Sequence, residues 1–544
     1  MVTAMDTATD TDMKTKFPIT HPLSGALLLC LSATVIAQQD MTGTSSSAPF
    51  VDQPPTTGER AWTIKPRVTL TETLTDNVNV NRTGNGKQSD LITELAPGVR
   101  IDARTARFKG YFDYSLLGQF YTQTDYSRTQ NSLNTFGTLE AIDNWLFLDF
   151  SGIIAQQAIS AFGAQSPSGS SINSNSTETA SYRLSPYIRG QFGGTVDYSL
   201  RHNRSTTQSD AAAANDIELS QWTGQLQGGT PFQNLKWTID GNRQTTEYSK
   251  GGKSEAETLR GLFSYSVLPQ FRVNLSAGRE SNNYASVDQE STNTHGYGFD
   301  WNPTERTQIS VFREKRFFGD GHNIRFNHRF PMSSITFTDT RDVSVLPNQF
   351  ATSGLGTAYD FFYPLLSQLC TQNSHGTPSQ SQIDNCVMNK LASRGMQPNT
   401  QVTGGFLTSR ATVQRSQALA LALFGARNSI TLLVNRNESQ SVLASNALND
   451  DFNQNSSIRQ QGLSLNFSHR LSELSTLNLL ASRQESTGNG AITTKTTSTT
   501  YQLNVSTTLG AKTTGSMSAR RSEFDSTSTP YTENALLGTV SFTY

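Results

Sequence analysis

The chain is short of charge and of long apolar runs. Of its 544 residues, 16% are charged and 35% are hydrophobic, and the formal net charge is −1. A net charge this close to zero provides no electrostatic attraction toward nucleic acid, so no nucleic-acid partner is expected. A water-soluble domain of this length would need longer apolar segments to fill its core. The composition therefore argues against both a nucleic-acid-binding protein and a large soluble domain.

Cysteine is scarce too, with only Cys30, Cys370 and Cys386 in the chain. Cys30 lies in the apolar N-terminal run described below, so its removal would leave one pair. In an exported protein such a pair predicts a disulfide between Cys370 and Cys386. His375 is the only histidine near them and lacks a second pair of ligands at metal-binding spacing.

The seven histidines do not form a recognisable catalytic or metal-binding pattern. His322 and His328 share one expected strand, where six residues separate them by about 20 Å, too far to share a metal. No glycine-rich phosphate loop follows a strand and opens a helix. We therefore expect no catalytic residue, no cofactor and no metal, and interpret the chain as a protein that is not an enzyme.

The N-terminal region has the pattern of a secretory signal peptide. A basic stretch beginning at Met13 precedes a 15-residue apolar run from Leu23 to Ala37. A membrane anchor is the alternative, but it would need about 20 apolar residues. We predict a signal peptide over residues 1–37, with Met1 or Met13 as the start, and a flexible periplasmic lead-in over residues 38–60.

From residue 61 to residue 544, apolar and polar side chains alternate. One example is the run Phe271, Val273, Leu275 and Ala277, which alternates with Arg272, Asn274 and Ser276. Successive side chains of a strand point to opposite faces, so this pattern gives each strand one apolar and one polar face. A transmembrane β-barrel requires this arrangement, with lipid outside and a wet lumen inside. We predict an all-β, antiparallel, up-and-down barrel over residues 61–544, in the outer membrane of a Gram-negative cell.

The connections between the expected strands are of two kinds. Longer polar stretches are expected as loops at 77–90, 158–178, 203–215, 282–293, 437–456 and 485–496. Short turns are expected near 104–106, 143–144, 193–194, 230–234, 268–270, 302–305, 331–333, 426–428, 472–475 and 510–513. With both chain ends on the side of the short turns, these turns predict about 22 strands, an even number between roughly 18 and 24.

The last residues form a strand that can close such a barrel. Leu536, Val540, Phe542 and Tyr544 share one face, and Thr539, Ser541 and Thr543 share the other. An amphipathic last strand ending on an aromatic residue resembles the strand recognised by the barrel-assembly machinery. We expect that machinery and outer-membrane lipid as partners.

Residues 341–400 interrupt the alternation. This connection is much longer than an ordinary loop, and apolar residues recur in it at helical spacing. We predict two short helices stapled by the cysteine pair. The element would be a plug in the lumen or a lid over its mouth, or else a surface excursion without a functional contact.

The alternation also predicts which charged side chains face the lumen. The candidates are Lys65, Arg67, Lys109, Asp113, Asp197, Arg201, Lys236, Asp240, Arg272, Arg325 and Arg329, with Asp300 as a further acid. A basic excess would favour anionic solutes such as acidic polysaccharide. The alternative is that these charges form ion pairs between strands and only stabilise the wall.

The chain resembles the family of outer-membrane β-barrels associated with PEP-CTERM/exosortase exopolysaccharide loci. The matching stretches are WTIKPRVTLTETLTDNV at 62–78, SDLITELAPG at 89–98, and segments at 111–119, 144–149 and 161–165. The resemblance spans the barrel and is distinctive up to about residue 165. It implies a role near exopolysaccharide secretion, with the polymer and its export proteins as partners. The family has no assigned catalytic residues, so it implies none here.

Three functions fit this pattern. The first is a channel or accessory conduit for exopolysaccharide secretion, which the polar lumen and the family resemblance favour. The second is a general or sugar-uptake porin. The third is a surface structural or adhesion barrel whose long loops bind.

Overall fold

The computed structural model describes residues 61–80, 86–211, 216–232, 234–249, 252–286, 288–345, 406–408, 410–442, 450–490 and 493–544. These residues form 22 strands and one short 3-10 helix, η1 (Asp451–Asn453). The strands are β1 (Trp62–Thr75), β2 (Asp90–Arg104), β3 (Phe108–Tyr121), β4 (Ser127–Ile142), β5 (Leu146–Ala158), β6 (Ser176–Phe192), β7 (Val196–Ser209), β8 (Ile217–Gly229), β9 (Leu235–Tyr248), β10 (Lys253–Leu268), β11 (Phe271–Asn282), β12 (Glu290–Thr304), β13 (Thr307–Arg316), β14 (Gly319–Arg329), β15 (Ser333–Ser344), β16 (Thr412–Phe424), β17 (Asn428–Ser441), β18 (Asn455–Arg470), β19 (Ser475–Gly490), β20 (Thr494–Gly510), β21 (Thr513–Asp525) and β22 (Tyr531–Thr543). Within the described part of the chain, no helix is long and apolar enough to cross a membrane.

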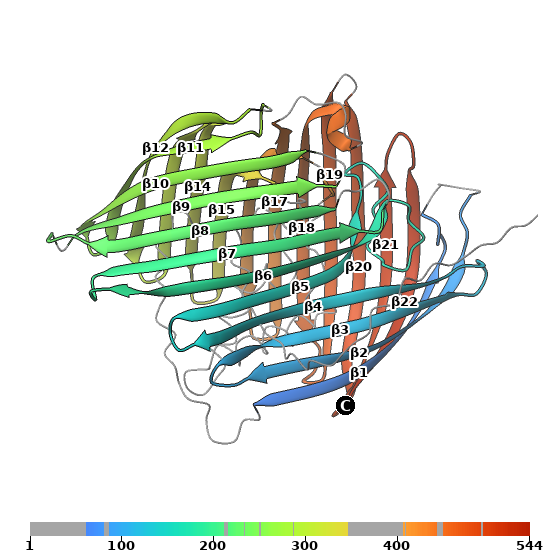
Figure 1. Cartoon of the computed structure of the whole chain (residues 1–544). Coiled ribbons are helices and arrows are strands. Elements are labelled where there is room, and N and C mark those ends of the chain that lie inside the picture. Colours follow the sequence, from blue (N-terminus) through green and yellow to red (C-terminus); the bar gives the residue numbers. More distant parts are fainter. Residues whose placement is uncertain are drawn as a thin grey trace, which may run out of the picture. The chain divides into compact units, whose positions relative to one another are not determined.

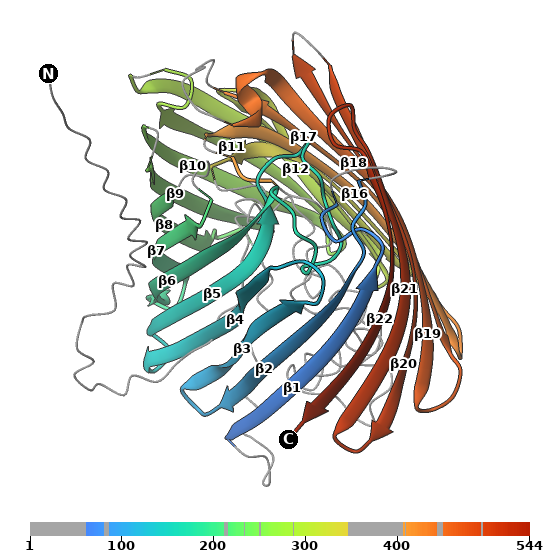
Figure 2. The same ribbon diagram turned by 90° about the vertical axis from the view of Figure 1, so that its right-hand side faces the viewer.

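The strands form one closed antiparallel sheet. Each strand pairs with its neighbours in sequence, and β1 pairs with both β2 and β22. Leu70 on β1 lies opposite Leu95 on one side and opposite Val540 on the other. Figure 2 shows β1 beside β22, and Figure 1 shows the strands of the near wall crossing those of the far wall, as tilted strands do in a barrel. The predicted up-and-down barrel of 22 strands is confirmed.

All ten expected short turns lie between strands. In the turn between β6 and β7, Gly193 and Gly194 have φ angles of 57° and 71°. A β-turn whose two central residues both have positive φ angles follows the twist of its strands, and glycine adopts this conformation without strain. The loop expected at 485–496 is wrong in extent, because β19 runs to Gly490 and β20 begins at Thr494. The polar residues there still pair across the two strands, for example Gly488 with Thr494, so the ladder continues beyond the apolar belt.

The long connection also begins later than expected. β15 continues to Ser344, and β16 begins at Thr412. Cys370, Cys386 and the two helices expected between residues 341 and 400 lie outside the described residues. The disulfide and the plug or lid therefore remain predictions.

Large apolar side chains are exposed on one face of the sheet. Ile64, Leu74, Leu259, Leu275 and Leu536 are each more than half exposed. Trp301 on β12 lies on this face, and Trp145 lies in the short turn before β5. Both are exposed and lie at the end of the barrel that carries the short turns. A continuous apolar belt with aromatic residues at its edge is the surface of a barrel that contacts lipid.

The opposite face is the lumen. Tyr248 on β9 donates a hydrogen bond to the carbonyl oxygen of Val345, just beyond β15, across 2.9 Å. Only side chains on the concave face can join strands so far apart in the sheet. Because directly paired residues share a face, the registers then assign every strand position to the lumen or to the outer surface.

Candidate functional site

The registers place all of the predicted lumen residues on the lumen face. Lys65 lies opposite Arg100, Asp113 also lies opposite Arg100, and Asp240 lies opposite Arg260. The other members of the set, reached through the same pairings, are Arg67, Lys109, Asp197, Arg201, Lys236, Arg272, Arg325 and Arg329, together with Asp300. On the closing strand, Leu536, Val540 and Phe542 face outward opposite Leu74, Leu70 and Val68, and Tyr544 follows the end of β22.

Several of these charges form ion pairs between strands. Arg67 binds Asp113 at 2.6 Å, and Arg100 binds Asp102 at 2.9 Å and Asp113 at 3.4 Å. The guanidinium of Arg100 also lies 4.8 Å from the centroid of the Tyr111 ring. This part of the lumen wall is therefore a ladder of paired charges. It matches the alternative in which the lumen charges pair with one another and stabilise the wall.

A second group combines arginine with aromatic rings. Phe147 and Tyr187 stack at 5.0 Å on β5 and β6. Arg201 lies 3.9 Å from the Tyr187 centroid and binds Asp149 at 2.7 Å, while Arg189 lies 4.3 Å from the Phe147 centroid. Each ring has the other ring on one face and a guanidinium over its other face, and Phe147 is buried. The stack therefore presents its two arginines, rather than open ring faces, as hydrogen-bond donors.

The wall formed by β17–β22 differs from the rest of the lumen. Its inward positions are mostly Ser, Thr, Asn and Gln, for example Ser464, Ser482, Thr500 and Ser522 in one row across β18–β21. The charged exceptions on these strands are Arg470, Arg520 and Glu533, and the last two bind each other at 3.1 Å. Hydroxyls and amides both donate and accept hydrogen bonds without carrying charge. The lumen thus has one neutral polar wall and, on β1–β14, a wall rich in charges.

Residues 159–175, called the inward segment, connect β5 to β6 and fold into the barrel. The backbone N–H of Ala161 and the hydroxyl of Ser160 both donate to Asp451, which lies in η1 before β18, at 2.7 Å each. Tyr531 on β22 donates to the carbonyl of Gln165. Ile172 N–H donates to the carbonyl of Val78, beyond β1, at 2.9 Å. The inward segment is therefore tied to the start of β18, nine strands from β5 around the ring, and to the β22–β1 junction, five and four strands away.

The neighbouring wall holds the inward segment as well. On β3, Tyr121 donates to the carbonyl of Ser170 at 2.6 Å. The carbonyl of Gly169 accepts from Arg128 at 2.7 Å and from Gln130 at 3.1 Å. Inward-facing side chains of β3 and β4 thus satisfy backbone groups that would otherwise bond to water.

Apolar packing accompanies these hydrogen bonds. Ala161 packs with Phe406, Phe452 and Ile458, and all four are buried. Residue 406 forms an isolated bridge with Ala158 at the end of β5. A water-exposed loop would not bury these groups, so the side chains favour the folded-in conformation.

Burial also affects the anchoring carboxylate. Removal from water raises the pKa of Asp451 above its ordinary value, against the opposing effect of the hydrogen bonds from Ala161 and Ser160. Asp451 lies in η1 rather than in a spanning strand. Its two hydrogen bonds therefore act in a partly dehydrated site, where each is strengthened.

A second apolar cluster lies inside the other half of the barrel. Leu219 on β8 packs with Tyr284, Val345 and Ala411, and all four are buried. These residues come from the loop ends of β11, β15 and β16 as well as from β8. Together with the inward segment, they narrow the lumen at the end opposite the short turns.

The inward segment differs from the sequence-based expectation, in which 158–178 was a polar loop. The sequence does contain an indication that this segment is buried. Its residues include the apolar Ala161, Phe162, Ala164 and Ile172, which a loop exposed to water would not need. One matching stretch of the family resemblance, residues 161–165, also falls here. Pattern reasoning cannot show where such residues are buried, because their partners lie far away in sequence.

Of the histidines that the structure describes, His202, His322, His328 and His469 have a local hydrogen-bond partner. His322 on β14 faces outward and binds Asp339 at 2.9 Å, and His469 binds Asn428 at 2.6 Å. His202 stacks on Trp222 at 4.4 Å. Within the described ranges, no group of three or more His, Cys, Asp or Glu side chains is placed to hold a metal ion.

Comparison with known proteins identifies similar folds only. No family model matches the chain, and no curated protein matches it. Among solved structures, the apoprotein FrpB iron transporter from Neisseria meningitidis is 9% identical, with a TM-score of 0.47 over 89% of this chain and 81% of that one. The siderophore receptor PirA from Acinetobacter baumannii is 8% identical, with a TM-score of 0.45 over 88% and 80%. OccK5 (OpdH) from Pseudomonas aeruginosa is 8% identical, with a TM-score of 0.32 over 89% and 98%. At these identities, the ligands of the other barrels carry no information about this one.

Proposed function

We propose that this protein is an outer-membrane channel or accessory conduit through which exopolysaccharide leaves the cell, and that it does not act as an enzyme. The observation that carries the proposal is the neutral polar wall of β17–β22. A hydroxylated polymer can exchange its hydrogen bonds with water for bonds with Ser, Thr, Asn and Gln at little net cost. Because these hydrogen bonds involve no charged groups, no single position holds the polymer strongly. Transport requires such weak binding, since the polymer must leave each position again.

The opposite wall suits the same cargo. The stacked pair Phe147–Tyr187 holds Arg201 and Arg189 over its rings, and these guanidinium groups can donate hydrogen bonds to the hydroxyls of a sugar. The family resemblance in residues 62–165 also favours a role near polysaccharide export. The exposed apolar belt supports placement in a membrane, with the short turns on the periplasmic side.

Deletion of the gene tests this proposal directly. We expect extracellular polysaccharide to fall strongly while polymer accumulates in the periplasm, and plasmid-borne wild-type protein to restore secretion. Complementation with Phe147→Ala/Tyr187→Ala should restore it only in part, whereas Phe112→Ala/Tyr114→Ala, which removes rings from the outer surface of β3, should restore it fully. Unchanged extracellular polysaccharide in the deletion strain would contradict the proposal.

A sugar-uptake porin is the second candidate, favoured by the inward segment that narrows the lumen. Planar bilayer recordings separate the two functions. A porin gives a steady ohmic conductance that added oligosaccharide blocks, whereas a conduit opened by its export partners stays closed alone. We expect the closed behaviour for the full-length mature chain.

A further inference from the structure

A hollow lies on the outer surface of the barrel, across β18–β22 and β1. Its volume is about 820 Å³. Its floor includes Leu74, Leu465, Leu479, Leu503 and Leu536, all facing outward and at least two-fifths exposed. An apolar depression within the lipid-facing belt is shaped to hold acyl chains more tightly than a flat strand surface would.

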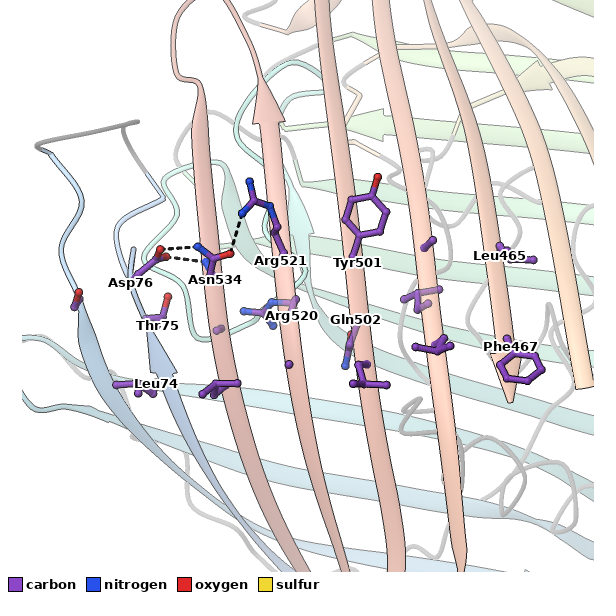
Figure 3. A pocket seen from close by; sticks show the side chains of 18 residues that line it. Leu74, Thr75, Asp76, Leu465, Phe467, Tyr501, Gln502, Arg520, Arg521 and Asn534 are labelled. Carbon is purple, nitrogen blue, oxygen red and sulfur yellow. Dashed lines mark hydrogen bonds between the residues drawn. The ribbon is translucent and has the colours of Figure 1, made fainter. Parts of the chain in front are cut away.

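Polar residues border the hollow at the end away from the short turns. Tyr501, Arg521 and Asn534 follow one another in a single register row across β20–β22 (Figure 3). Arg521 binds Glu523 at 2.6 Å and lies 3.4 Å from the side-chain oxygen of Asn534. The border therefore places the Arg521 guanidinium above the apolar floor, with the carboxylates of Glu523 and Asp76 beside it.

Arg483 on β19 is the second cation here. It lies two residues beyond Ala481, which lines the hollow, and its register partners are Leu463 and Thr499. Arg483 is exposed and forms no ion pair with any residue that the structure describes. A guanidinium without a counter-charge at the edge of an apolar surface can bind an anionic lipid headgroup.

The outward charge is uneven around the barrel. Near the loop ends of β16–β19, the outward cations are Arg415, Arg436, Arg459 and Arg483, and the outward acids are Glu438 and Glu485. Arg415 binds Asp339 on β15 at 2.7 Å, while Arg436 and Arg459 share Glu438 at 3.1 and 3.6 Å. On β7–β10, by contrast, each arginine has its own acid: Arg204 binds Glu218 at 3.3 Å, and Arg243 binds Glu257 at 3.2 Å. The basic excess is therefore on the side of the hollow.

We propose that this surface binds an acylated glycolipid of the outer leaflet that carries two phosphates. Its acyl chains occupy the hollow, and its phosphates lie against Arg483 and Arg521. These arginines stand two strands apart and two residues out of row, about 12 Å between Cα atoms at the spacing of a β-sheet, so each arginine can pair with its own phosphate. The proposal rests on the outer-membrane placement proposed above, with the loops outside, and is independent of what the lumen carries.

Binding by the purified full-length mature chain in detergent tests this. The probes are diphosphorylated lipid A, its monophosphorylated form and phosphatidylethanolamine, with bound lipid counted by native mass spectrometry. We expect the diphosphorylated lipid to bind at least tenfold more tightly than the other two. Arg483→Gln/Arg521→Gln should abolish this preference, and the matched outward pair Arg204→Gln/Arg243→Gln should keep it within twofold.

A second pair of variants tests the hollow itself. Ala481→Trp fills it and should weaken binding of the diphosphorylated lipid, whereas Ala277→Trp, outward on β11, should not. Heat-modifiable electrophoretic mobility verifies that every variant is a folded barrel. Three results would overturn the proposal. They are equal binding of all three lipids, equal losses of lipid binding in the test and control variants, and a dimer that covers the hollow and excludes lipid. Polysaccharide secretion is a separate readout, so failure of the conduit function would leave this result interpretable.

Discussion

At the scale of single residues, the inner face contains charges that depend on one another. Arg260 on β10 binds Asp240 and Glu314 at 3.3 Å each, and all three are less than a tenth exposed. Removing the cation would leave both buried carboxylates without the guanidinium that bridges them.

We therefore expect Arg260→Leu to destabilise the folded barrel by about 3–5 kcal/mol, the usual cost of breaking one partner of a buried ion pair. Denaturant titration of the protein in detergent measures this. The control is Arg243→Leu on β9, which removes an exposed pair and should cost about 0–1 kcal/mol. Equal costs for both variants would show that the lumen is wet enough to screen the buried group.

Asp76 is a second residue on which local structure depends, because it lies at the junction of β1 and β22. Its carboxylate accepts from the backbone N–H of Asn534 at 2.7 Å and from its side chain at 2.8 Å, and binds Lys87 at 3.1 Å. Burial would raise the pKa of Asp76, but these hydrogen bonds outweigh it and hold the pKa below its ordinary value of 3.8.

Because the folded-state pKa is lowered, the stabilisation is present above the ordinary pKa and is lost as pH falls through the lowered value. We expect the protection of the amides of residues 532–536 against hydrogen exchange to fall below about pH 4, after correction for the intrinsic exchange rate at each pH. The amides that exchange only by global unfolding should keep their protection. Asp76→Asn should give the faster exchange at neutral pH and remove the acid step. An unchanged acid step in this variant would assign the effect to another carboxylate.

At the scale of elements, the inward segment has ends joined by a hydrogen bond from the Ile159 N–H to the Asn175 carbonyl and a middle part held by side chains from other strands. It packs closely at β19, where a Cβ added to Gly488 would lie 2.2 Å from the Asn455 side-chain oxygen and 2.8 Å from the Phe162 ring. Glycine at this position lets the segment approach the wall.

The anchor at Asp451 gives a direct test of this element. Asp451→Ala leaves the N–H of Ala161 and the Ser160 hydroxyl without their acceptor, at a local cost of about 1–3 kcal/mol for each bond. We expect the inward segment to loosen and brief, noisy conductance events to appear in planar bilayer recordings of a barrel that is otherwise closed. Asp143→Ala, which removes an exposed ion pair with Arg107 at a short turn, should leave conductance unchanged. A silent Asp451→Ala variant would mean that the apolar contacts suffice.

At the scale of the whole molecule, closure between β1 and β22 turns an extended sheet into a barrel. Thr69 and Ser541 face each other across this junction, with their hydroxyl oxygens 2.9 Å apart. Closure removes the two unpaired edges that would otherwise bind other chains.

We expect Thr69→Cys/Ser541→Cys to form a disulfide, because directly opposed residues come close to the required Cβ separation. The heated, unreduced chain should then run as a closed ring, with a mobility that reductant changes. Thr73→Cys/Ser541→Cys, four residues out of register, should show no such change. Cross-linking of the control alone would mean that the register of closure is shifted.

Sequence alone determined the barrel, its strand number and the faces of its strands. Alternation has a period of two and turn residues act locally, so Phe271–Ala277 or Gly193–Gly194 carry that information without knowledge of distant partners. The lumen positions of residues such as Arg67 and Asp240 follow from the same period. Register alone decided three other features, because it brings residues from many strands into one row. They are the pairing among the lumen charges, the neutral wall of β17–β22 and the basic excess on the outer surface of β16–β19. The inward segment was decided by tertiary structure alone, because Asp451 and Tyr531, which hold it, lie hundreds of residues away and are recognisable as its partners only after the barrel has closed.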